Sequence, residues 1–361
     1  MKILWLSHRD PFHPKAGGAE RTIAEVASRL SSYGHEITVL STKWNGSKCL
    51  FRMGSVVIRR FGNSFALHLY VPIFTLKYKP DLIINDLGHA VPWPSTTLLG
   101  KKSIIFFRHL HARSLPGQVS KILALAITAV ERCYFLIYPH RVFVTESTTS
   151  LDDLLSIGIP KINVMLNPPG VDLHLYNLSS KTAKPSIVYF GGFRHYKRPT
   201  EVVYIFKDIS DQLPDATLTF IGNGPDLEHV KSTVKDLKLT DKTRFTGRIE
   251  TKELAEALSR CWLNVHTSVT EGWGLSILEA SAAGTPTVAY SVPGVNDAIE
   301  NGLNGIKVKD GDRSAFVRSA VSILNDPLKW QASSRKVAEK YSWDSTAKVW
   351  DKLIRDTVNG R

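Results

Sequence analysis

The chain has 361 residues, of which 43% are hydrophobic and 22% are charged. This composition is typical of a globular protein, and it excludes an intrinsically disordered chain and a protein built from membrane-spanning helices. The length favours two domains of ordinary size over one continuous core.

The cysteines and the first residues of the chain indicate in which cellular compartment the protein is expected. Cys49, Cys133 and Cys261 are far apart and odd in number, so the sequence predicts neither a disulfide framework nor a zinc site. The opening MKILWLSHRDPF has an apolar run too short for a secretory signal, and we expect no cleaved signal. A reducing compartment, the cytoplasm, is therefore the expected location.

The net charge of +13 is unevenly distributed. From Met1 to Gly170 there are 20 Lys and Arg against 10 Asp and Glu, a net of +10, and the remainder holds 26 against 23, a net of +3. A basic N-terminal half favours an anionic partner, whether nucleic acid, acidic lipid headgroups or a phosphorylated substrate. A charged surface that only aids solubility is the alternative.

The first half of the chain alternates short apolar runs with helical segments, which predicts βαβ units and a parallel sheet. The clearest helix is Ala19–Ser32, where apolar residues recur at helical spacing before Gly34. The predicted strands are Lys2–Ser7, Glu36–Thr42, Val56–Arg60, Asp81–Asn85, Ser103–Phe107, Arg141–Thr145 and Ile162–Met165.

Ser120–Tyr138 is the most hydrophobic segment of the chain. Glu131 and Arg132 interrupt it, so a spanning helix is not expected. A buried helix is the main interpretation. The alternative is a helix whose exposed face rests on a membrane, a reading favoured by the upstream cations Lys101, Lys102, Arg108 and Arg113.

Asn167–Pro185 is rich in Pro, Gly and Ser and breaks the alternation, so we interpret residues 171–185 as an interdomain linker. The alternation of strands and helices then restarts. The fold class that it predicts is α/β, with two doubly wound Rossmann-like domains at residues 1–170 and 186–341. Ligands are expected in a cleft, beyond the carboxyl ends of the strands. The second half contains predicted strands at Ser186–Phe190, Thr217–Ile221, Thr243–Thr246, Leu263–His266 and Pro286–Ala289, and predicted helices near Thr200–Ser210, Asp226–Val234, Thr251–Ser259 and Leu275–Ala283.

The stretch TEGWGLSILEA, Thr270 to Ala280, follows the predicted strand Leu263–His266. Glu271 precedes a Gly-Trp-Gly turn, and Glu279 lies about two turns into the helix that follows. The free N–H groups at a helix start attract phosphate, and glycines let an anion approach the backbone. Eight residues at the helical rise span roughly 12 Å, which suits a sugar at Glu271, a diphosphate at the turn and a ribose at Glu279.

Two other glycine turns favour phosphate binding. FGGFRHYKRP, Phe190 to Pro199, follows a strand and adds the cations Arg194, Lys197 and Arg198, which could neutralise a departing diphosphate. HPKAGGAER places Gly17 and Gly18 just before a helix. Either turn alone is also explained by ordinary helix entry.

FFRHLHARS, Phe106 to Ser114, ends a predicted strand with His109 and His111. Histidines at this edge of an α/β sheet are as compatible with a functional role as with a structural one. No spacing of His, Glu and Asp resembles a metal site, and no G-x-S-x-G elbow occurs.

Together these residues resemble the family 4 retaining glycosyltransferases, which have the GT-B fold and a Glu, seven residues, Glu signature. The match to that signature is Glu271 and Glu279 within TEGWGLSILEASAAGTPTVAYSVPGVNDAIENGLNGIKV. The resemblance covers nearly the whole chain, through the GG-A-E near the start, VTESTTSLDDLLSIGIP, NPPGVD, IGNGP and TGRI.

The resemblance implies a role for each matching residue. Glu271, His109 and Lys197 would form the catalytic group, with Glu271 on the donor sugar, His109 near the reacting sugar and Lys197 on the diphosphate. Glu279 would bind the ribose. The other donor-binding residues would be Gly18, Gly192, Arg194, Gly222, Gly224, Arg248, Ile249, Gly274, Leu275 and Ser276. The acceptor-side candidates are Gly17, His111 and Asp86.

One departure from the family pattern concerns the diphosphate. The family usually has an Arg where this chain has Gly192, and the nearest cation is Arg194. Either Arg194 reaches back or stabilisation of the leaving group rests mainly on Lys197, and we expect the first.

The resemblance also implies that the last helix, 342–361, crosses back to the N-terminal domain, and that the enzyme needs no metal or other cofactor. The expected reaction is transfer of a hexose from a donor such as UDP-glucose or GDP-mannose to an acceptor hydroxyl with retention. The basic N-terminal half favours a lipid-linked or cell-surface glycan as acceptor, with the protein at an anionic membrane surface on the cytoplasmic face.

Other functions remain open on the sequence alone. A nucleotide-sugar epimerase of the same fold would turn over its donor without an acceptor. A nucleic-acid-binding module is disfavoured because no reading motif occurs, so nucleic acid is not an expected partner. An NAD oxidoreductase would need G-x-G-x-x-G after the first strand, and the chain lacks it there.

Overall fold

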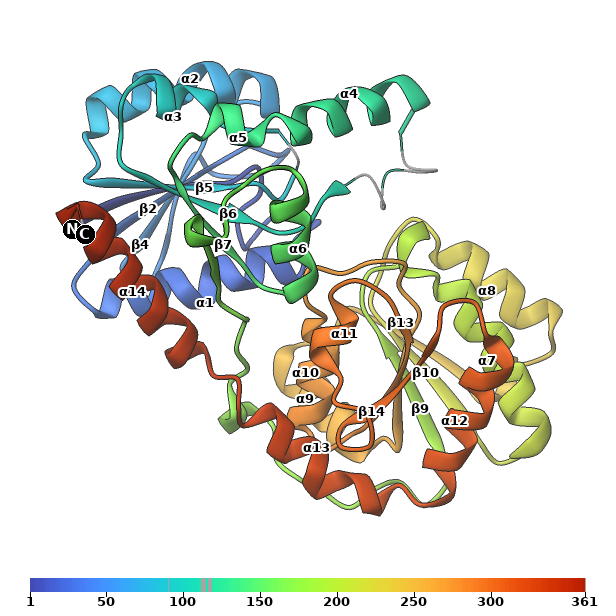
Figure 1. Ribbon diagram of the computed structural model, residues 1–361. Coiled ribbons are helices and arrows are strands. Elements are labelled where there is room, and N and C mark those ends of the chain that lie inside the picture. Colours follow the sequence, from blue (N-terminus) through green and yellow to red (C-terminus); the bar gives the residue numbers. More distant parts are fainter. Residues whose placement is uncertain (90, 112–114, 116–118, 361) are drawn as a thin grey trace. The chain divides into compact units, whose positions relative to one another are not determined.

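The computed structural model describes residues 1–89, 91–111, 115 and 119–360. The chain forms two compact units. Unit 1 comprises Met1–Pro169 together with Trp343–Arg361, and unit 2 comprises Gly170–Ser342 (Figure 1). Each unit contains one sheet covered by helices on both faces, which confirms the predicted class of two doubly wound Rossmann-like domains.

The sheet of unit 1 has the strand order β3-β4-β2-β1-β5-β6-β7-β8. All neighbouring strands are parallel except β3 and β4, which pair antiparallel at one edge. The strands are β1 (Lys2–Leu6), β2 (Glu36–Ser41), β3 (Leu50–Met53), β4 (Val56–Arg60), β5 (Leu82–Asp86), β6 (Ser103–Phe107), β7 (Val142–Thr145) and β8 (Val164–Leu166). The helices are α1 (Gly18–Ser32), α2 (Ser64–Tyr78), α3 (Pro94–Leu98), α4 (Lys121–Arg132), α5 (Tyr134–Ile137), α6 (Thr148–Ser156) and α14 (Trp343–Asn359).

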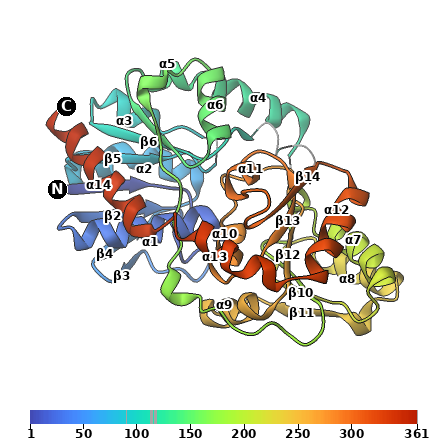
Figure 2. The ribbon, with the colours of Figure 1, turned by 60° about the horizontal axis from the view of Figure 1, so that its bottom comes forward.

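Helix α14 contains the last residues of the chain, yet it packs beside α1 on the sheet of unit 1 (Figures 1 and 2). Its Trp350 is buried and lies 5.6 Å from the ring of Trp5 and 5.0 Å from that of Phe106. At its polar side, Asp351 accepts a 2.6 Å hydrogen bond from the buried ring of His35. An amphipathic helix therefore completes one face of the N-terminal sheet.

The opposite face of that sheet is covered by α2, α5 and α6, which share one hydrophobic core with the strands, and α3 packs beside α2. Helix α4 is different, because nearly all of its apolar side chains are exposed or half-buried. The interpretation of Ser120–Tyr138 as a buried helix is therefore wrong for α4, and it holds only for Tyr134 and Tyr138 at and beyond α5. Within the described residues, no helix has both the length and the apolar character needed to span a bilayer.

The sheet of unit 2 has the order β11-β10-β9-β12-β13-β14, and every pair is parallel. Strand order reverses between β9 and β12, which makes this pair the topological switch point. The strands are β9 (Ser186–Phe190), β10 (Thr217–Ile221), β11 (Thr243–Gly247), β12 (Leu263–His266), β13 (Thr287–Ser291) and β14 (Gly305–Lys309). The helices are α7 (Pro199–Gln212), α8 (Leu227–Asp236), α9 (Thr251–Arg260), α10 (Leu275–Ala282), α11 (Val295–Ala298), α12 (Arg313–Asn325) and α13 (Gln331–Ala338).

The segment 171–185, which the sequence predicts as a linker, belongs to unit 2. Val171 and Tyr176 are buried in the core of that unit. The Val171 N–H donates a 3.1 Å hydrogen bond to the carbonyl of Tyr341, next to the point where the chain leaves unit 2.

Candidate active site

Two loops leave the switch point of unit 2, and they contain several of the residues singled out in the sequence. The first runs from β9 to α7 and includes Gly192, Arg194 and Lys197. The second runs from β12 to α10 and includes Glu271 and the Gly-Trp-Gly turn. Because both strands are parallel, their carboxyl ends and these loops lie at the same edge of the sheet.

Hydrogen bonds join the two loops directly. The Val269 N–H donates to the carbonyl of Tyr196 at 2.8 Å. The Thr267 hydroxyl lies 2.9 Å from the carbonyl of Lys197 and 3.0 Å from that of Arg198. The Lys197 side chain is therefore presented from a backbone that is fixed to the loop of Glu271.

Arg198 has a structural position in this arrangement. Its guanidinium donates to the carbonyls of Thr267 at 2.6 Å and Ser268 at 3.0 Å, and it pairs with Asp310. The sequence suggested Arg198 as a cation for the diphosphate, but these contacts direct its charge toward the neighbouring loop. Lys197 and Arg194 remain the cations of the first loop that can serve a ligand.

Glu271 forms an ion pair with Lys197, and both side chains are mostly buried. Its Oε1 also accepts hydrogen bonds from Ser268 Oγ at 2.6 Å and from His266 Nε2 at 3.1 Å. Among the described residues, these donors all meet Oε1, so Oε2 is the oxygen available to a ligand hydroxyl.

The electrostatics keep this pair ionised. Burial alone would raise the pKa of Glu271, but the charge of Lys197 and the hydrogen bond from His266 outweigh it and hold that pKa well below its usual range. Burial acts to lower the pKa of Lys197, and the carboxylate of Glu271 reverses this effect and raises it. A carboxylate acceptor and an ammonium donor therefore face the site together at neutral pH.

His266, the last residue of β12, connects two parts of the site. Because the Glu271 carboxylate cannot donate, Nε2 of His266 must hold the proton in their hydrogen bond. In the neutral ring Nδ1 is then an acceptor, and the Ser276 hydroxyl lies 3.3 Å away. The sequence analysis did not identify His266, although its place at the carboxyl end of a buried strand was a usable signal.

The turn before α10 has the backbone that its glycines predict. Gly274 has φ 105° and caps the helix, and Leu275 and Ser276 begin the first turn, where backbone N–H groups lack helical acceptors. Glu271 is fixed from the other side, because its N–H donates to the carbonyl of Pro293 at 3.0 Å. A Cβ at Gly294 would lie 2.3 Å from the carbonyl oxygen of Glu271, so only glycine permits this approach.

Glu279, the second carboxylate of the motif, lies in the second turn of α10 and is 6% exposed. Its Oε1 accepts a 3.0 Å hydrogen bond from the hydroxyl of Tyr176. Tyr176 comes from the segment predicted as a linker, and nothing in its local sequence indicated this contact.

Arg194 lies over Gly192. A Cβ built on Gly192 would be 3.6 Å from Nε and 3.8 Å from Cγ of Arg194. The Arg194 side chain thus folds back across the position where the family usually has its arginine, and its charge acts to lower the pKa of the neighbouring Lys197.

Gly222 and Gly224 follow β10 and pack tightly against the first loop. A Cβ on Gly222 would lie 2.0 Å from the carbonyl oxygen of Gly191, and one on Gly224 would lie 2.3 Å from that of Phe193. Close packing between backbones therefore accounts for these two glycines. Arg248, which is exposed, and the half-buried Ile249 directly follow β11 at the same edge of the sheet.

The acceptor-side candidates lie in unit 1. Gly17 caps α1, and its N–H donates to Glu20 Oε2 at 2.7 Å. Gly17 and Gly18 are both exposed. A Cβ on Gly17 would come no closer to a neighbouring atom than 3.8 Å, so a side chain here would project into open space.

Asp86 is buried and pairs with Arg108 at 2.9 Å. Arg108 also pairs with Glu146 at 3.0 Å and donates to the carbonyl of Ala19 at 3.1 Å. Arg108 is thus not a surface cation, and it ties the ends of three strands to the start of α1. Arg113 lies outside the described residues.

His109 and His111 lie side by side, with ring centroids 4.7 Å apart. His111 is fixed by Glu131, whose Oε1 lies 2.9 Å from both its N–H and its Nδ1. The charged residue that interrupts the apolar segment thus positions one histidine of the predicted pair.

A further ring cluster at this edge was not anticipated. His8 and His68 both stack on Trp93, with centroids at 4.6 and 4.2 Å. Burial, followed by the charges of His68 and Arg9, lowers the pKa of His8 to about 3. These imidazoles are neutral at physiological pH.

No group of three or more His, Cys, Asp or Glu among the described residues is arranged to hold a metal ion.

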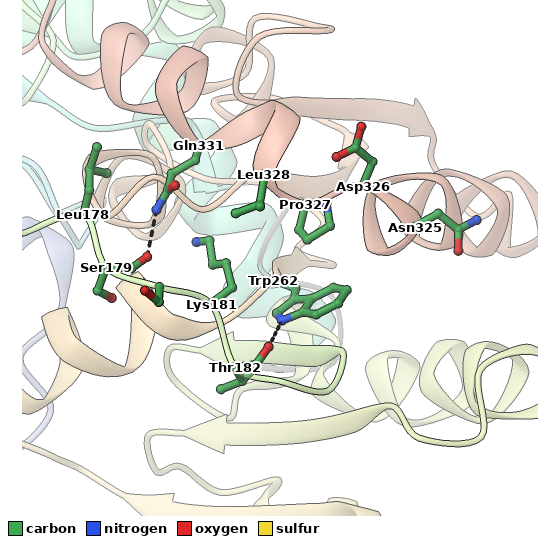
Figure 3. Close-up of a pocket in the computed structure, with 11 residues that line it drawn as sticks. Leu178, Ser179, Lys181, Thr182, Trp262, Asn325, Asp326, Pro327, Leu328 and Gln331 are labelled. Atoms are coloured by element: carbon green, nitrogen blue, oxygen red, sulfur yellow. Dashed lines mark hydrogen bonds between the residues drawn. The ribbon is translucent and has the colours of Figure 1, made fainter.

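A pocket of about 820 Å³ does occur in unit 2, lined by Lys181, Trp262, Leu328 and neighbouring residues (Figure 3). The backbone N–H of Trp262 donates a hydrogen bond to the carbonyl of Ser186, at the start of β9. This pocket is therefore at the amino-terminal edge of the sheet, away from Glu271 and Lys197.

Comparison with known proteins agrees with this geometry. The model for glycosyltransferase family 4 matches residues 16–175, and the model for glycosyl transferases group 1 matches residues 176–342. The chain belongs to the family 4 glycosyltransferases, enzymes with the GT-B fold.

The chain is similar to a curated protein and to two solved structures, among others. Glycogen synthase from Mycobacterium tuberculosis is 24% identical over 96% of this chain and 92% of its own length. The structure of sucrose-phosphate synthase from Thermosynechococcus elongatus has a TM-score of 0.84 at 19% identity, over 100% of both chains. HepE from Anabaena, solved with UDP-glucose, has a TM-score of 0.77 at 18% identity, over 100% of both chains.

Proposed function

We propose that the protein transfers a hexose from a nucleoside diphosphate sugar to an acceptor hydroxyl with retention of the anomeric configuration. The observation that carries this proposal is the Lys197–Glu271 pair at the switch point of unit 2, beside the N-terminus of α10. An ammonium group, free N–H groups and an ionised carboxylate suit a ligand that joins a diphosphate to a polyhydroxylated ring.

The diphosphate would be bound by cations and amides. Lys197 and Arg194 supply positive charge from one loop, and the N–H groups of Gly274, Leu275 and Ser276 supply donors at the helix start. These groups would offset the charge that develops on the leaving phosphate. This set is the basis for proposing a reaction that needs no metal or other cofactor.

The sugar would lie at Glu271 and the ribose at Glu279. Oε2 of Glu271 can accept from a sugar hydroxyl while Oε1 keeps its donors. Glu279, which already accepts a hydrogen bond from the Tyr176 hydroxyl, would also accept from a ribose hydroxyl. Arg248 and Ile249 would border the base, and Gly192, Gly222 and Gly224 would shape the loops around it.

His266 extends this proposal beyond the residues that the sequence identified. Its imidazole connects Ser276, in the proposed diphosphate subsite, with Glu271, in the proposed sugar subsite. A phosphate that engages the Ser276 hydroxyl would thereby affect the orientation of the sugar-binding carboxylate.

The acceptor would be bound by unit 1, where the acceptor-side candidates Gly17, Asp86 and His111 lie. The same unit contains Gly18, proposed for the donor, and the catalytic candidate His109. We propose a lipid-linked or cell-surface glycan as acceptor, at the cytoplasmic face of a membrane. The support is the basic charge of the N-terminal half. The donor would be UDP-glucose or GDP-mannose, and the HepE structure with UDP-glucose makes the uridine nucleotide the first to test.

The decisive experiment is a thermal-shift screen of nucleotide sugars, followed by detection of nucleoside diphosphate release from each stabilising donor. One donor should raise the melting temperature of the wild-type protein and leave that of Glu271→Ala unchanged or raise it less. Release in the absence of acceptor, accompanied by an epimerised sugar, would contradict the proposed transfer. NMR of the first product formed would establish the anomeric configuration.

A further inference from the structure

Helix α2 is apolar on two opposite sides. One side packs into the core of unit 1 through Leu67, Val71 and Phe74. The other side is exposed and has apolar residues at a spacing of four, four and three residues, which forms a stripe along a helix. The exposed residues are Phe65, Leu69, Ile73 and Leu76.

Helix α4 is apolar with few contacts to the rest of its unit. Glu131, which binds His111, is the buried residue of this helix. The stretch from Lys121 to Leu136 exposes a series of large apolar side chains, which are Ile122, Leu123, Leu125, Val130, Phe135 and Leu136. A helix with this character is normally covered, either by a protein core or by lipid.

These side chains belong to one layer of the molecule. Helices α2 and α5 share a hydrophobic core with the strands, and α3 and α4 lie on the same side of the sheet (Figure 1). Leu98 of α3, which packs beside α2, is 85% exposed. We call the exposed apolar residues of α2, α3, α4 and α5 the apolar face. Monomeric proteins rarely expose so many large apolar side chains without a partner.

The sequence that forms this face is rich in cations and poor in acids. No aspartate or glutamate occurs between Glu36 and Asp81, or between Asp86 and Glu131. Residues 37–130 contain 12 Lys and Arg but only two acids. Asp81 accepts a hydrogen bond from the backbone of Lys2, and Asp86 is buried with Arg108.

We propose that the apolar face of unit 1 rests on the surface of a bilayer that contains anionic lipids. Apolar side chains would enter the boundary between headgroups and acyl chains, while exposed cations such as Lys77, Lys79, Lys121 and Arg132 meet the headgroups. A second copy of the chain fits this face poorly, because a symmetric contact would bring two cationic surfaces together.

The choice of a bilayer as the partner of the apolar face rests on the proposed function, because that function has a lipid-linked acceptor. The proposal also extends that function, because it assigns the membrane contact to α2 and α4 and leaves the donor loops of unit 2 out of it.

The test is flotation of the full-length protein with vesicles of phosphatidylcholine alone or with 30% phosphatidylglycerol added, without nucleotide sugar. Binding should require the anionic lipid and weaken with salt. A double variant with Leu69→Asp and Leu125→Asp should bind vesicles at least tenfold more weakly. These two side chains are 61% and 71% exposed. Lys121→Gln should weaken it about fivefold at low salt. Leu328→Asp in unit 2, at a side chain 63% exposed, is the matched control and should bind like the wild type.

Three results would overturn the proposal. The first is a wild-type protein that does not float with anionic vesicles at low salt. The second is binding that the Leu69 and Leu125 substitutions leave unchanged. The third is a wild-type protein that does not bind vesicles but sediments as a dimer, if the Leu69 and Leu125 substitutions convert that dimer to a monomer. Nucleoside diphosphate release with a water-soluble acceptor should be unaffected in the Leu69 and Leu125 variant, so failure of vesicle binding and failure of sugar transfer are separate outcomes.

Discussion

Replacing Glu271 by glutamine removes one charge from the proposed sugar subsite and nearly preserves its shape. Lys197 then loses its carboxylate partner inside a mostly buried site, where the two side chains are 19% and 12% exposed. Breaking a fully buried pair costs about 3–5 kcal/mol, and partial exposure reduces this to about 2–3 kcal/mol. For a unit of this size, each kcal/mol lowers the melting temperature by about 2–4 °C.

Activity should fall by a different route. A hydrogen bond from a sugar hydroxyl to a charged acceptor contributes about 1.5–3 kcal/mol, so its loss lowers kcat/KM about 10- to 150-fold. Affinity for the free nucleoside diphosphate should stay the same or increase, because Lys197 then has the phosphates as its counter-ion. Turnover is measured as nucleoside diphosphate release, and affinity by calorimetry with UDP or GDP.

Two further variants separate the contributions. Ser268→Ala removes a neutral donor to the same oxygen and should cost about 1 kcal/mol, which is less than tenfold in rate. Glu271→Gln with Lys197→Met removes both charges and should recover most of the melting temperature but none of the turnover. A Glu271→Gln enzyme with turnover within threefold of the wild type, or one that loses nucleotide affinity in parallel with turnover, would refute this division of roles.

Four other outcomes can be measured. Arg194→Ala should raise the Kd of the nucleoside diphosphate about tenfold, since a charge-assisted contact is lost; an unchanged Kd would show that Arg194 does not bind the diphosphate. His266→Ala should lower kcat about tenfold and leave nucleotide affinity unaltered, so equal kcat values would exclude a positioning role. The pKa of His8 is about 3 in the folded chain, so below about pH 6.5 the unfolded chain binds a proton that the folded chain does not. The free energy of unfolding should therefore fall by about 1.4 kcal/mol per pH unit as the pH drops from 6.5 to 3. Urea titrations at pH 7, 6 and 5 should show that this free energy depends less steeply on pH in His8→Asn. Trp350→Ala should cost about 3–5 kcal/mol, visible as selective loss of structure in unit 1 by hydrogen exchange, and a uniform effect on both units would contradict the packing described.

The parallel core strands were predictable, because buried strands are short apolar runs between helical segments. Ser186–Phe190, Thr217–Ile221 and Leu263–His266 match the observed strands residue for residue. Strands β3 and β14 were missed for a physical reason. Both lie at sheet edges. Strand β14 contains Lys307 and Lys309 in place of a continuous apolar run, and β3 is only four residues long.

Helix α4 shows the limit of periodicity as a guide. A hydrophobic run predicts that a segment avoids water, but it does not identify what covers the segment. The sequence of Ser120–Tyr138 was compatible with a buried helix and with a membrane-facing helix, and the exposure of Leu125 and its neighbours excludes only the buried helix.

The candidate site was predictable where one local pattern contains the chemistry, as in Glu271 followed by a glycine turn and a helix start. Contacts between distant segments were not predictable. His266 reaches Ser276 across the turn, Arg194 folds over Gly192, and Tyr176 reaches Glu279 from 103 positions away along the chain. Each of these depends on how the loops pack, which no spacing in the sequence encodes.

The position of α14 has a consequence for biosynthesis. Residues Trp343–Asn359 cover part of the sheet of unit 1, so the first domain to leave the ribosome cannot complete its folding until α14 has been made. Until then, Trp5 and Phe106 have no Trp350 to pack against. The nascent chain would therefore hold a finished second domain together with an unfinished first one, and loss of α14 would damage the N-terminal half.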